Sequence, residues 1–150
     1  MRVVSLLVAC VLTVLVGCRT TRPSIYVPAA SVPPEVRRQA DEQYARAKAC
    51  LMESCGVVFS KDYPYSLLLI KGEKKVDGLW AWNEKGVGYV GGMSTGYAII
   101  IACNPTNFGE VSEGVLYHEL GHHLIRNVFQ DGSHNPKYDP CFNWSKLPNR

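Results

Sequence analysis

The sequence predicts an α+β domain, and three observations support this prediction. Apolar residues recur at spacings of three and four between positions 34 and 56, as they do along one face of an amphipathic helix. Residues 57–102 contain short apolar runs separated by turn-forming residues, which is typical of strands. A second helical pattern runs from about 110 to 129. We therefore expect an N-terminal helix, a small and mostly antiparallel sheet, a second helix and an irregular C-terminal segment.

The expected N-terminal helix begins within a proline pair. Pro34 suits the first helical turn, where its missing N–H is not needed, and Glu35 favours the positive start of the helix. The helix should end near Gly56. The apolar positions that share one face of this helix are Val36, Ala40, Tyr44, Ala47 and Leu51.

Short apolar runs after this helix predict three or four strands, with a further strand before the second helix. Residues 84–86 have the composition of a hairpin turn, and residues 71–78 are polar and turn-like. Gly91, Gly92 and Gly96 then mark a bend. The expected strands lie at 57–59, 66–70, 79–83, 87–91 and 97–102, and the last of these is the most strand-like.

Aromatic residues are concentrated in the expected hairpin. Trp80, Trp82 and Tyr89 would form a binding surface if they faced solvent, but aromatic residues in strands more often pack in the core or across to a neighbouring strand. We expect packing. The loop before the second helix contains Asn107, a candidate for its N-cap.

The N-terminus has the pattern of an export signal. Arg2 provides a positive start, and residues 3–16 form an apolar run that is too short for a comfortable membrane span. The Leu-Val-Gly-Cys tetrad that ends at Cys18 resembles the lipobox of bacterial lipoproteins. The resemblance implies that Cys18 carries a palmitate-containing lipid on a chain anchored to the membrane of the bacterial envelope. A plain secretory signal or an uncleaved anchor is the alternative.

These features predict a signal peptide at 1–17, a tether at 18–32 and a single domain at 33–150. Arg19 stands where enteric-type bacteria place the Asp that retains lipoproteins at the inner membrane, so we expect the outer membrane. The formal net charge is +3, and no run of Lys or Arg resembles a nucleic-acid footprint, so we expect no nucleic-acid partner. We expect a monomer.

Four cysteines remain after the signal peptide and the lipidated Cys18 are set aside. In an exported protein they would lie in an oxidising compartment, where disulfides form. Four cysteines allow three pairings. We expect Cys50 to pair with Cys55, and Cys103 with Cys141. A four-cysteine zinc site is not expected, because the chain has no close Cys-x-x-Cys pair.

The second expected helix contains an H-E-x-x-H motif. His118 and His122 are four residues apart, so both rings lie on one helix face and can converge on one zinc ion. Glu119 lies beside the ion, where its carboxylate can take a proton from zinc-bound water and later give it to a leaving amine. His123 points about 100° away from His122 and cannot join the site. The motif is typical of zinc-dependent peptidases.

A catalytic zinc requires a third protein ligand and an open position for water. No Glu follows Glu119, which excludes the peptidases that use a downstream glutamate, and Ile125 and Val128 break the metzincin pattern. The remaining candidates for the third ligand are His134, Asp139 and Asp131. We favour His134, because imidazole suits zinc and the loop around Gly132 can turn the chain back to the helix.

Residues 118–138 resemble the active-site region of the SprT-like metallopeptidases, in which H-E-x-x-H is followed by a His-Gly-containing turn. The resemblance implies that His118, His122 and His134 are the zinc ligands and that Glu119 is the general base. Asn135 departs from the usual Gly, and the export signal does not fit the intracellular DNA-associated role of that family. The resemblance therefore concerns the geometry of the site.

Zincins in general pair an extended substrate with an edge strand that precedes the motif helix. The strand at 97–102 matches that place in the sequence, so we expect Tyr97, Ile99 and Ile101 to bind substrate. Tyr138 is a candidate hydrogen-bond donor to the oxyanion of the tetrahedral intermediate, or else a packing tyrosine.

The sequence thus predicts a zincin-like domain that hydrolyses peptide bonds with zinc-activated water, on a lipid-anchored envelope protein. Its expected partners are a peptide or protein substrate and the membrane. Two other functions remain open: a non-catalytic, zinc-stabilised envelope lipoprotein that acts as a scaffold or adaptor, and a structural lipoprotein without metal.

Overall fold

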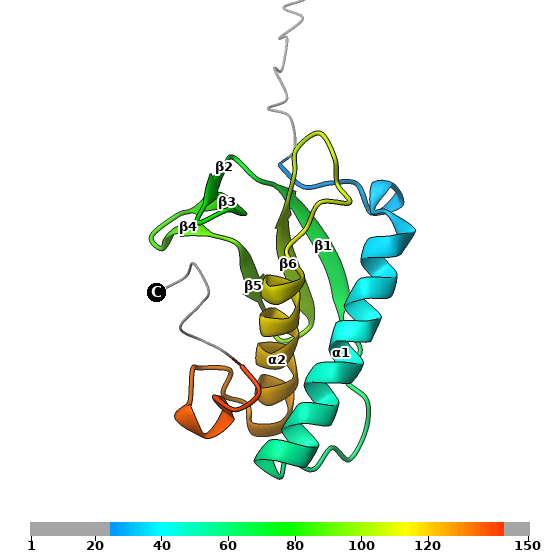
Figure 1. The fold of residues 1–150 in the computed structure, drawn as a ribbon, viewed down its shortest axis with the longest axis vertical. Helices are drawn as coiled ribbons and strands as arrows, with labels where there is room; N and C mark the ends of the chain where they lie inside the picture. The colour runs from blue at the N-terminus through cyan, green and yellow to red at the C-terminus, as the bar shows by residue number, and fades with distance from the viewer. Residues whose placement is uncertain (1–24, 143–150) are drawn as a thin grey trace, which may run out of the picture.

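The computed structural model of the protein describes residues 25–142, so the expected signal peptide, Cys18 and most of the expected tether lie outside the described residues. The fold is α+β (Figure 1). In chain order its elements are η1 (Ala29–Ser31), α1 (Pro34–Cys55), β1 (Ser66–Lys71), β2 (Lys74–Val76), β3 (Leu79–Glu84), β4 (Gly88–Val90), β5 (Gly92–Ser94), β6 (Ala98–Cys103), α2 (Glu113–Phe129) and η2 (Pro136–Tyr138).

Helix α1 follows its sequence pattern closely. Pro34 occupies its first turn, and Gly56 ends it in the left-handed conformation with φ of +67°, which glycine adopts without steric cost. No helix among residues 25–142 is long and apolar enough to cross a membrane. The residues that α1 buries are Val36, Ala40, Gln43, Ala47 and Leu51.

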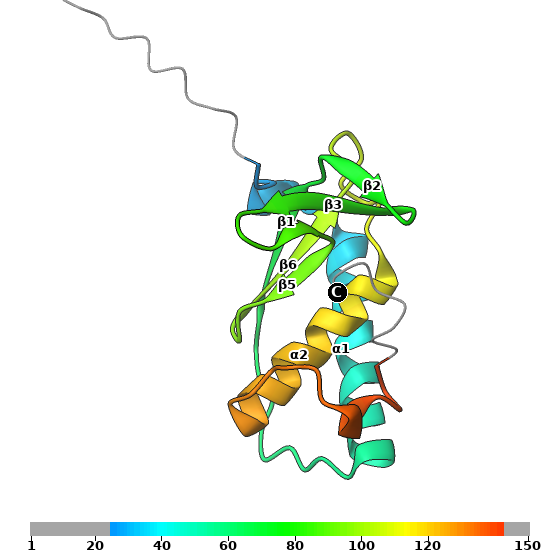
Figure 2. The ribbon, with the colours of Figure 1, turned by 90° about the vertical axis from the view of Figure 1, so that its left-hand side faces the viewer.

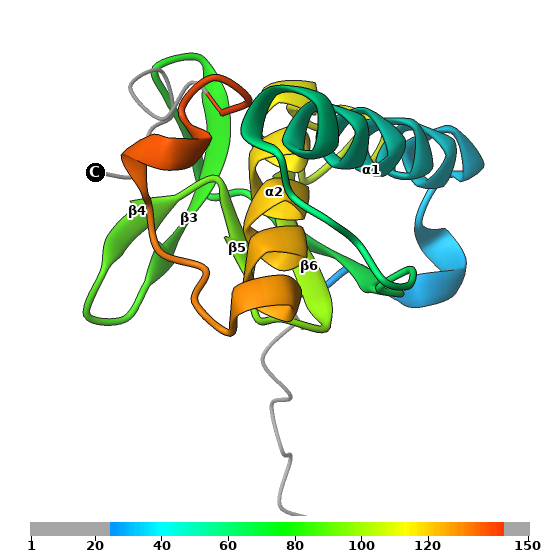
Figure 3. The ribbon, with the colours of Figure 1, turned by 90° about the horizontal axis from the view of Figure 1, so that it is seen from below.

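The main sheet has the strand order β1-β6-β5, with β6 parallel to β1 and antiparallel to β5. Both long helices pack side by side on one face of this sheet (Figures 1 and 3). Side chains alternate along the strands, so Leu69, Ile99 and Ile101 point to this face and join one buried cluster with both helices. This layer places α2 directly over β5 and β6.

A second sheet, β2-β3-β4, packs on the opposite face of β1 and β6 (Figure 2). Ile70 and Ala102 point to this side and pack with Trp82 and Val90, which are cross-strand neighbours in β3 and β4. The hairpin turn expected at 84–86 is confirmed by the antiparallel pairing of β3 with β4. Trp82 is buried, as expected for a packing aromatic residue.

The last eight residues of the tether expected at 18–32 pack against the domain. Residues 25–32 belong to the fold: Val27 donates its N–H to Leu69 O at 2.9 Å, and Val27 and Val32 are buried. The physical reason is the outer edge of β1, whose backbone groups require partners that this segment supplies. The domain therefore begins at or before Ile25, not at Pro33.

Other differences from the expected elements concern short segments. Residues 57–59 form no strand, whereas the polar 74–76 and the glycine-containing 92–94 do. The short strand β5 forms because it pairs with β6, a contact that local composition does not reveal. Helix α2 begins at Glu113, and its N-cap is Ser112, which accepts a hydrogen bond from Val115 N at 3.2 Å; Asn107 is not the cap.

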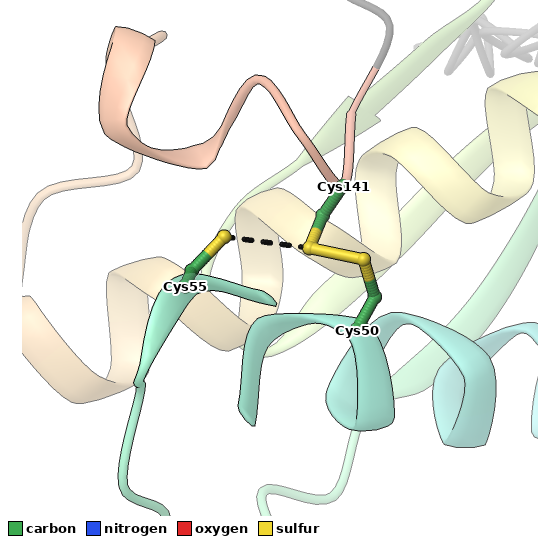
Figure 4. Close-up of a disulfide and its surroundings, with 3 residues drawn as sticks. All are labelled: Cys50, Cys55 and Cys141. Atoms are coloured by element: carbon green, nitrogen blue, oxygen red, sulfur yellow. Dashed lines mark hydrogen bonds between the residues drawn. A yellow bond between two sulfur atoms is a disulfide. The ribbon is translucent and has the colours of Figure 1, made fainter. Parts of the chain in front are cut away.

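The expected disulfide pairing is wrong. Cys50 near the end of α1 is bonded to Cys141 in the C-terminal segment, and Cys55 Sγ lies 3.4 Å from Cys141 Sγ (Figure 4). Cys103 is a buried free thiol in the central strand β6 and donates to Ile70 O. The disulfide thus joins the C-terminal segment, residues 131–142, to α1.

Candidate metal centre

Helix α2 places the H-E-x-x-H motif in the middle of the domain. The helix is fixed at its start by the Ser112 cap and by the favourable charge of Glu113 in the first turn. Its buried residues include Leu116, Leu120 and Leu124, which pack in the two helix-side clusters. His118 and His122 share the face of α2 that faces away from this packing, as the four-residue spacing predicts.

Three histidine nitrogens converge at this face. His122 Nε2 lies 3.0 Å from His118 Nε2, and His134 Nε2 lies 3.0 Å from His122 Nε2 and 3.3 Å from His118 Nε2. Three ligand atoms bound tetrahedrally at the usual Zn–N length would be about 3.3 Å apart. The triangle therefore has the size of a metal site, and the three histidines can hold one metal ion.

The tautomer of His122 suits a metal ligand. Its Nδ1 is hydrogen-bonded to the carbonyl oxygen of Gly132. Because a carbonyl can only accept, Nδ1 carries the proton, and the lone pair of Nε2 is directed towards the other two rings. A backbone carbonyl that orients a histidine in this way is the usual outer partner of a metal ligand.

Burial keeps these rings neutral. His118 is 6% exposed, and burial, together with the neighbouring histidines, lowers its pKa to about 2. Burial also lowers the pKa of His122 to about 4, against the opposing effect of the Gly132 carbonyl. Neutral imidazoles are the form that binds a cation, so the site needs no deprotonation of these two residues near neutral pH.

Glu119 is a buried carboxyl group next to this triangle. It is 6% exposed, and burial raises its pKa to about 8, although Arg126 and the N–H of Ser94 act in the opposite direction. Gly92 in β5 provides the space: a Cβ there would lie 2.7 Å from Glu119 Cγ and 2.6 Å from Val115 Cγ1. A divalent cation bound beside Glu119 would lower this pKa again and leave a carboxylate that can accept a proton.

The triangle opens into a hollow of about 220 Å³ between α2, β5, the β3–β4 hairpin and the C-terminal segment. A larger hollow of about 510 Å³ lies between α1 and the chain before β1, and it is lined by no histidine. The residues that line the smaller hollow are Val87, Val90, Gly92, Met93, Ser94, His118, Glu119, His122, Arg126, Gly132 and His134.

The structure brings His134 to the triangle, and the two other candidates for the third ligand lie elsewhere. Asp131 accepts a hydrogen bond from Ser133 N, and Asp139 ends the short helix η2 on the surface. His123 is fully buried on another face of α2, where its Nε2 lies 3.0 Å from Tyr63 O. It takes no part in the site, as expected.

Four residues that the sequence assigns to the site do not line the hollow. Tyr138 is 5% exposed, stacks on Phe129 with ring centroids 5.9 Å apart, and does not line the hollow, so it is a packing residue. Ile99 and Ile101 are buried under the helices. Tyr97 is exposed, but it precedes a strand that is central in the sheet, so the expected edge position is wrong. The outer strand beside the triangle is β5.

Seven residues that line the hollow are not assigned to the site from the sequence, and Arg126, Ser94 and Gly132 are the ones with polar groups near the triangle. Arg126 lies one helical turn beyond His122, so the spacing of His118, His122 and Arg126 could have indicated it. Ser94 has no such signal, because it reaches the site through the pairing of β5 with β6. Gly132 is expected to turn the chain, but the hydrogen bond between its carbonyl oxygen and His122 depends on the tertiary fold. No protein-family model, curated protein or solved structure matches this chain.

Proposed function

We propose that this protein is a zinc-dependent metallopeptidase with a zincin-like domain, anchored as a lipoprotein in the bacterial envelope. The observation that supports this proposal best is the triangle of Nε2 atoms from His118, His122 and His134 with the buried carboxyl group of Glu119 beside it. Histidine nitrogens in a tetrahedral arrangement suit zinc, and three of them leave a fourth position for water. SprT-like enzymes are the family that the motif region resembles.

A zinc ion bound here would make its water acidic and polarise the carbonyl group of a peptide. Glu119 would accept the proton of the attacking water and deliver it to the nitrogen of the leaving amine, as a carboxylate held beside the bound ion can do in turn. His122 is oriented by the Gly132 carbonyl. An extended peptide would lie along β5, whose three residues all line the hollow.

The proposal includes a cellular location, which is inferred from the sequence. The lipobox-like tetrad that ends at Cys18 supports a lipid anchor, and Arg19 favours the outer membrane. We infer that the enzyme acts as a monomer on a peptide or protein of the envelope or its surroundings. Nucleic acid is not among the proposed partners.

The test is hydrolysis by the purified protein with a known zinc content. A mixture of proteome-derived peptides should acquire new termini, detected by mass spectrometry, only when about one zinc per chain is bound. A chelator should abolish the cleavage and added zinc should restore it. His122→Ala, prepared in parallel, controls for a contaminating peptidase. Stoichiometric zinc held by four protein ligands, without cleavage, would favour the non-catalytic scaffold instead.

A further inference from the structure

Arg126 brings a positive charge to the hollow that contains the histidine triangle. It is the only Lys or Arg among the described residues that line this hollow, and it follows His122 by one turn on the same face of α2. No carboxylate of residues 25–142 lies within 4.0 Å of its guanidinium group, since the described ion pairs join other residues. The guanidinium group therefore forms no ion pair with a described residue, although its charge lowers the pKa of both Glu119 and Asp131.

Two glycines leave the space that the Arg126 side chain occupies. A Cβ at Gly96, in the turn between β5 and β6, would lie 3.0 Å from Arg126 Cδ. A Cβ at Gly132 would lie 2.7 Å from Arg126 Nε and 3.1 Å from Nη2. Since Gly132 also accepts the hydrogen bond from His122, the arginine is held at a set place relative to the metal triangle.

Ser94 supplies a second polar group to the same hollow. It is 9% exposed, and its Oγ has no hydrogen-bond partner among the described residues. Its backbone N–H is already used, because it donates to the carboxyl group of Glu119. A buried hydroxyl group without a hydrogen-bond partner carries a desolvation penalty. A ligand that accepts a hydrogen bond from it would remove this penalty.

We propose that Arg126 and Ser94 bind a carboxylate of the substrate close to the scissile bond, so that the enzyme prefers peptides with an acidic side chain or a free terminal carboxylate at that place. This inference rests on the proposed peptidase function. A guanidinium group offers paired donors that match the two oxygens of a carboxylate, and a serine hydroxyl adds a third donor. Four helical residues rise about 6 Å, and an extended peptide advances about 3.3 Å per residue. The carboxylate then belongs to a residue one or two positions from the bond.

Two small probes test the carboxylate site without relying on turnover. Succinic acid monohydroxamate and its carboxamide analogue share the same zinc-binding group and differ only in the carboxylate. We expect the zinc-loaded full-length protein to bind the acid at least about 10-fold more tightly than the amide, measured by calorimetry. Arg126→Gln should reduce this ratio to about 1, mainly by weakening the binding of the acid, and its zinc content and circular dichroism spectrum show that the variant is loaded and folded. Ser94→Ala should reduce the ratio a few-fold.

Arg38→Gln is the matched control for net charge, because Arg38 lies on the exposed surface of α1 and pairs with Glu42. This variant should keep the preference for the acid. Equal affinities of the two probes for the parent protein, or a preference that survives in Arg126→Gln, would overturn the carboxylate site and leave the metal site intact. If neither hydroxamate binds to the zinc-loaded protein, the ion has no open coordination position, which refutes the proposed peptidase function rather than the carboxylate site alone.

Peptide substrates show whether the bound carboxylate belongs to an acidic side chain or to a free C-terminus. One pair differs by Glu or Gln beside the scissile bond, and a second pair by a free or an amidated C-terminus near it. The pair that shows a higher kcat/KM for the charged form, lost in Arg126→Gln, identifies the source. Equal rates within both pairs would contradict the proposal.

Discussion

The two sides of the histidine triangle are held by different kinds of structure. His118 and His122 are neighbours on one turn of α2, so their spacing depends on helix geometry alone. His134 reaches the same point from the C-terminal segment, residues 131–142, which has a single turn of 3-10 helix. That segment is fixed by distant contacts: Cys141 is bonded to Cys50 in α1, and the Phe142 ring lies over Gly121.

This difference separates the local part of the site from the part that depends on tertiary structure. The helical pair and Glu119 should persist wherever α2 is folded. The third ligand should be correctly placed only while the C-terminal segment is attached to both helices. Metal affinity therefore reports the state of this segment, and the following variants test the two sides separately.

The largest effect is expected from the ligands. His122→Ala removes half of the helical pair and should weaken zinc binding by more than about 100-fold, because even the loss of an outer partner of a ligand costs 10–100-fold. His134→Ala leaves the preorganised pair in place and should weaken binding less. A competition titration with a chromophoric zinc chelator measures both constants. An equal or larger loss in His134→Ala would show that the helical pair is not the dominant part.

The disulfide should have the next largest effect. Cys141→Ser frees the C-terminal segment from α1 and should lower the free energy of unfolding by about 2–5 kcal/mol. Cys50→Ser should cost less, because Cys55 Sγ lies 3.4 Å from Cys141 Sγ and can form the bond in its place. Denaturant unfolding gives the stabilities, and peptide mapping identifies the bond. Cys55→Ser, which keeps the native bond, is the control, and identical losses in Cys50→Ser and Cys141→Ser would be inconsistent with the replacement.

Gly121 tests the contact between the motif helix and the C-terminal segment. A Cβ at this position would lie 2.2 Å from Phe142 Cζ, so Gly121→Ala should displace the ring and destabilise the protein by about 1–3 kcal/mol, despite the better helix propensity of alanine. Gly114→Ala is the matched control in the same helix, since its nearest neighbour would be Ser112 Oγ at 3.8 Å. It should be neutral or stabilising. Thermal unfolding compares them, and a stabilising Gly121→Ala would refute the close packing.

The smallest effect concerns Glu110, which orders the loop before α2. Hydrogen bonds from Asn104, Lys75 and Trp80 lower its pKa to about 2. Because the pKa of the folded state is the lower one, the stabilisation is present at neutral pH and is lost as pH falls below about 4.5 towards 2. The melting temperatures of the parent and Glu110→Gln should therefore differ at pH 7 and converge near pH 2. A constant difference across this range would exclude the carboxylate as the cause.

The features that the sequence predicts correctly are local ones. The bounds of α1 follow from Pro34, the apolar spacing and Gly56, and the helical pair follows from the four-residue spacing of His118 and His122. His134 was also found, because few other residues after the helix can bind zinc. These features need only the periodicity and chemistry of the side chains.

The features that the sequence does not predict arise where distant segments of the chain meet. Cys141 pairs with Cys50 because the C-terminal segment folds back onto α1, which no spacing reveals. The strand at 98–103 is central because β5, a segment that looked like a glycine-rich bend, pairs with its other edge. For the same reason the sequence points to Tyr97 and Tyr138 rather than to Ser94. Tertiary pairing overrides local composition at each of these positions.

In the proposed mechanism, Glu119 acts as the general base beside a zinc ion that it does not bind. The most direct measurement compares the parent protein with Glu119→Gln for zinc content and for the rate of peptide cleavage on the same preparation. We expect Glu119→Gln to keep about one zinc per chain and to lose at least about 100-fold in kcat, as removal of a general base does. A variant that binds zinc and cleaves as fast as the parent would contradict the mechanism.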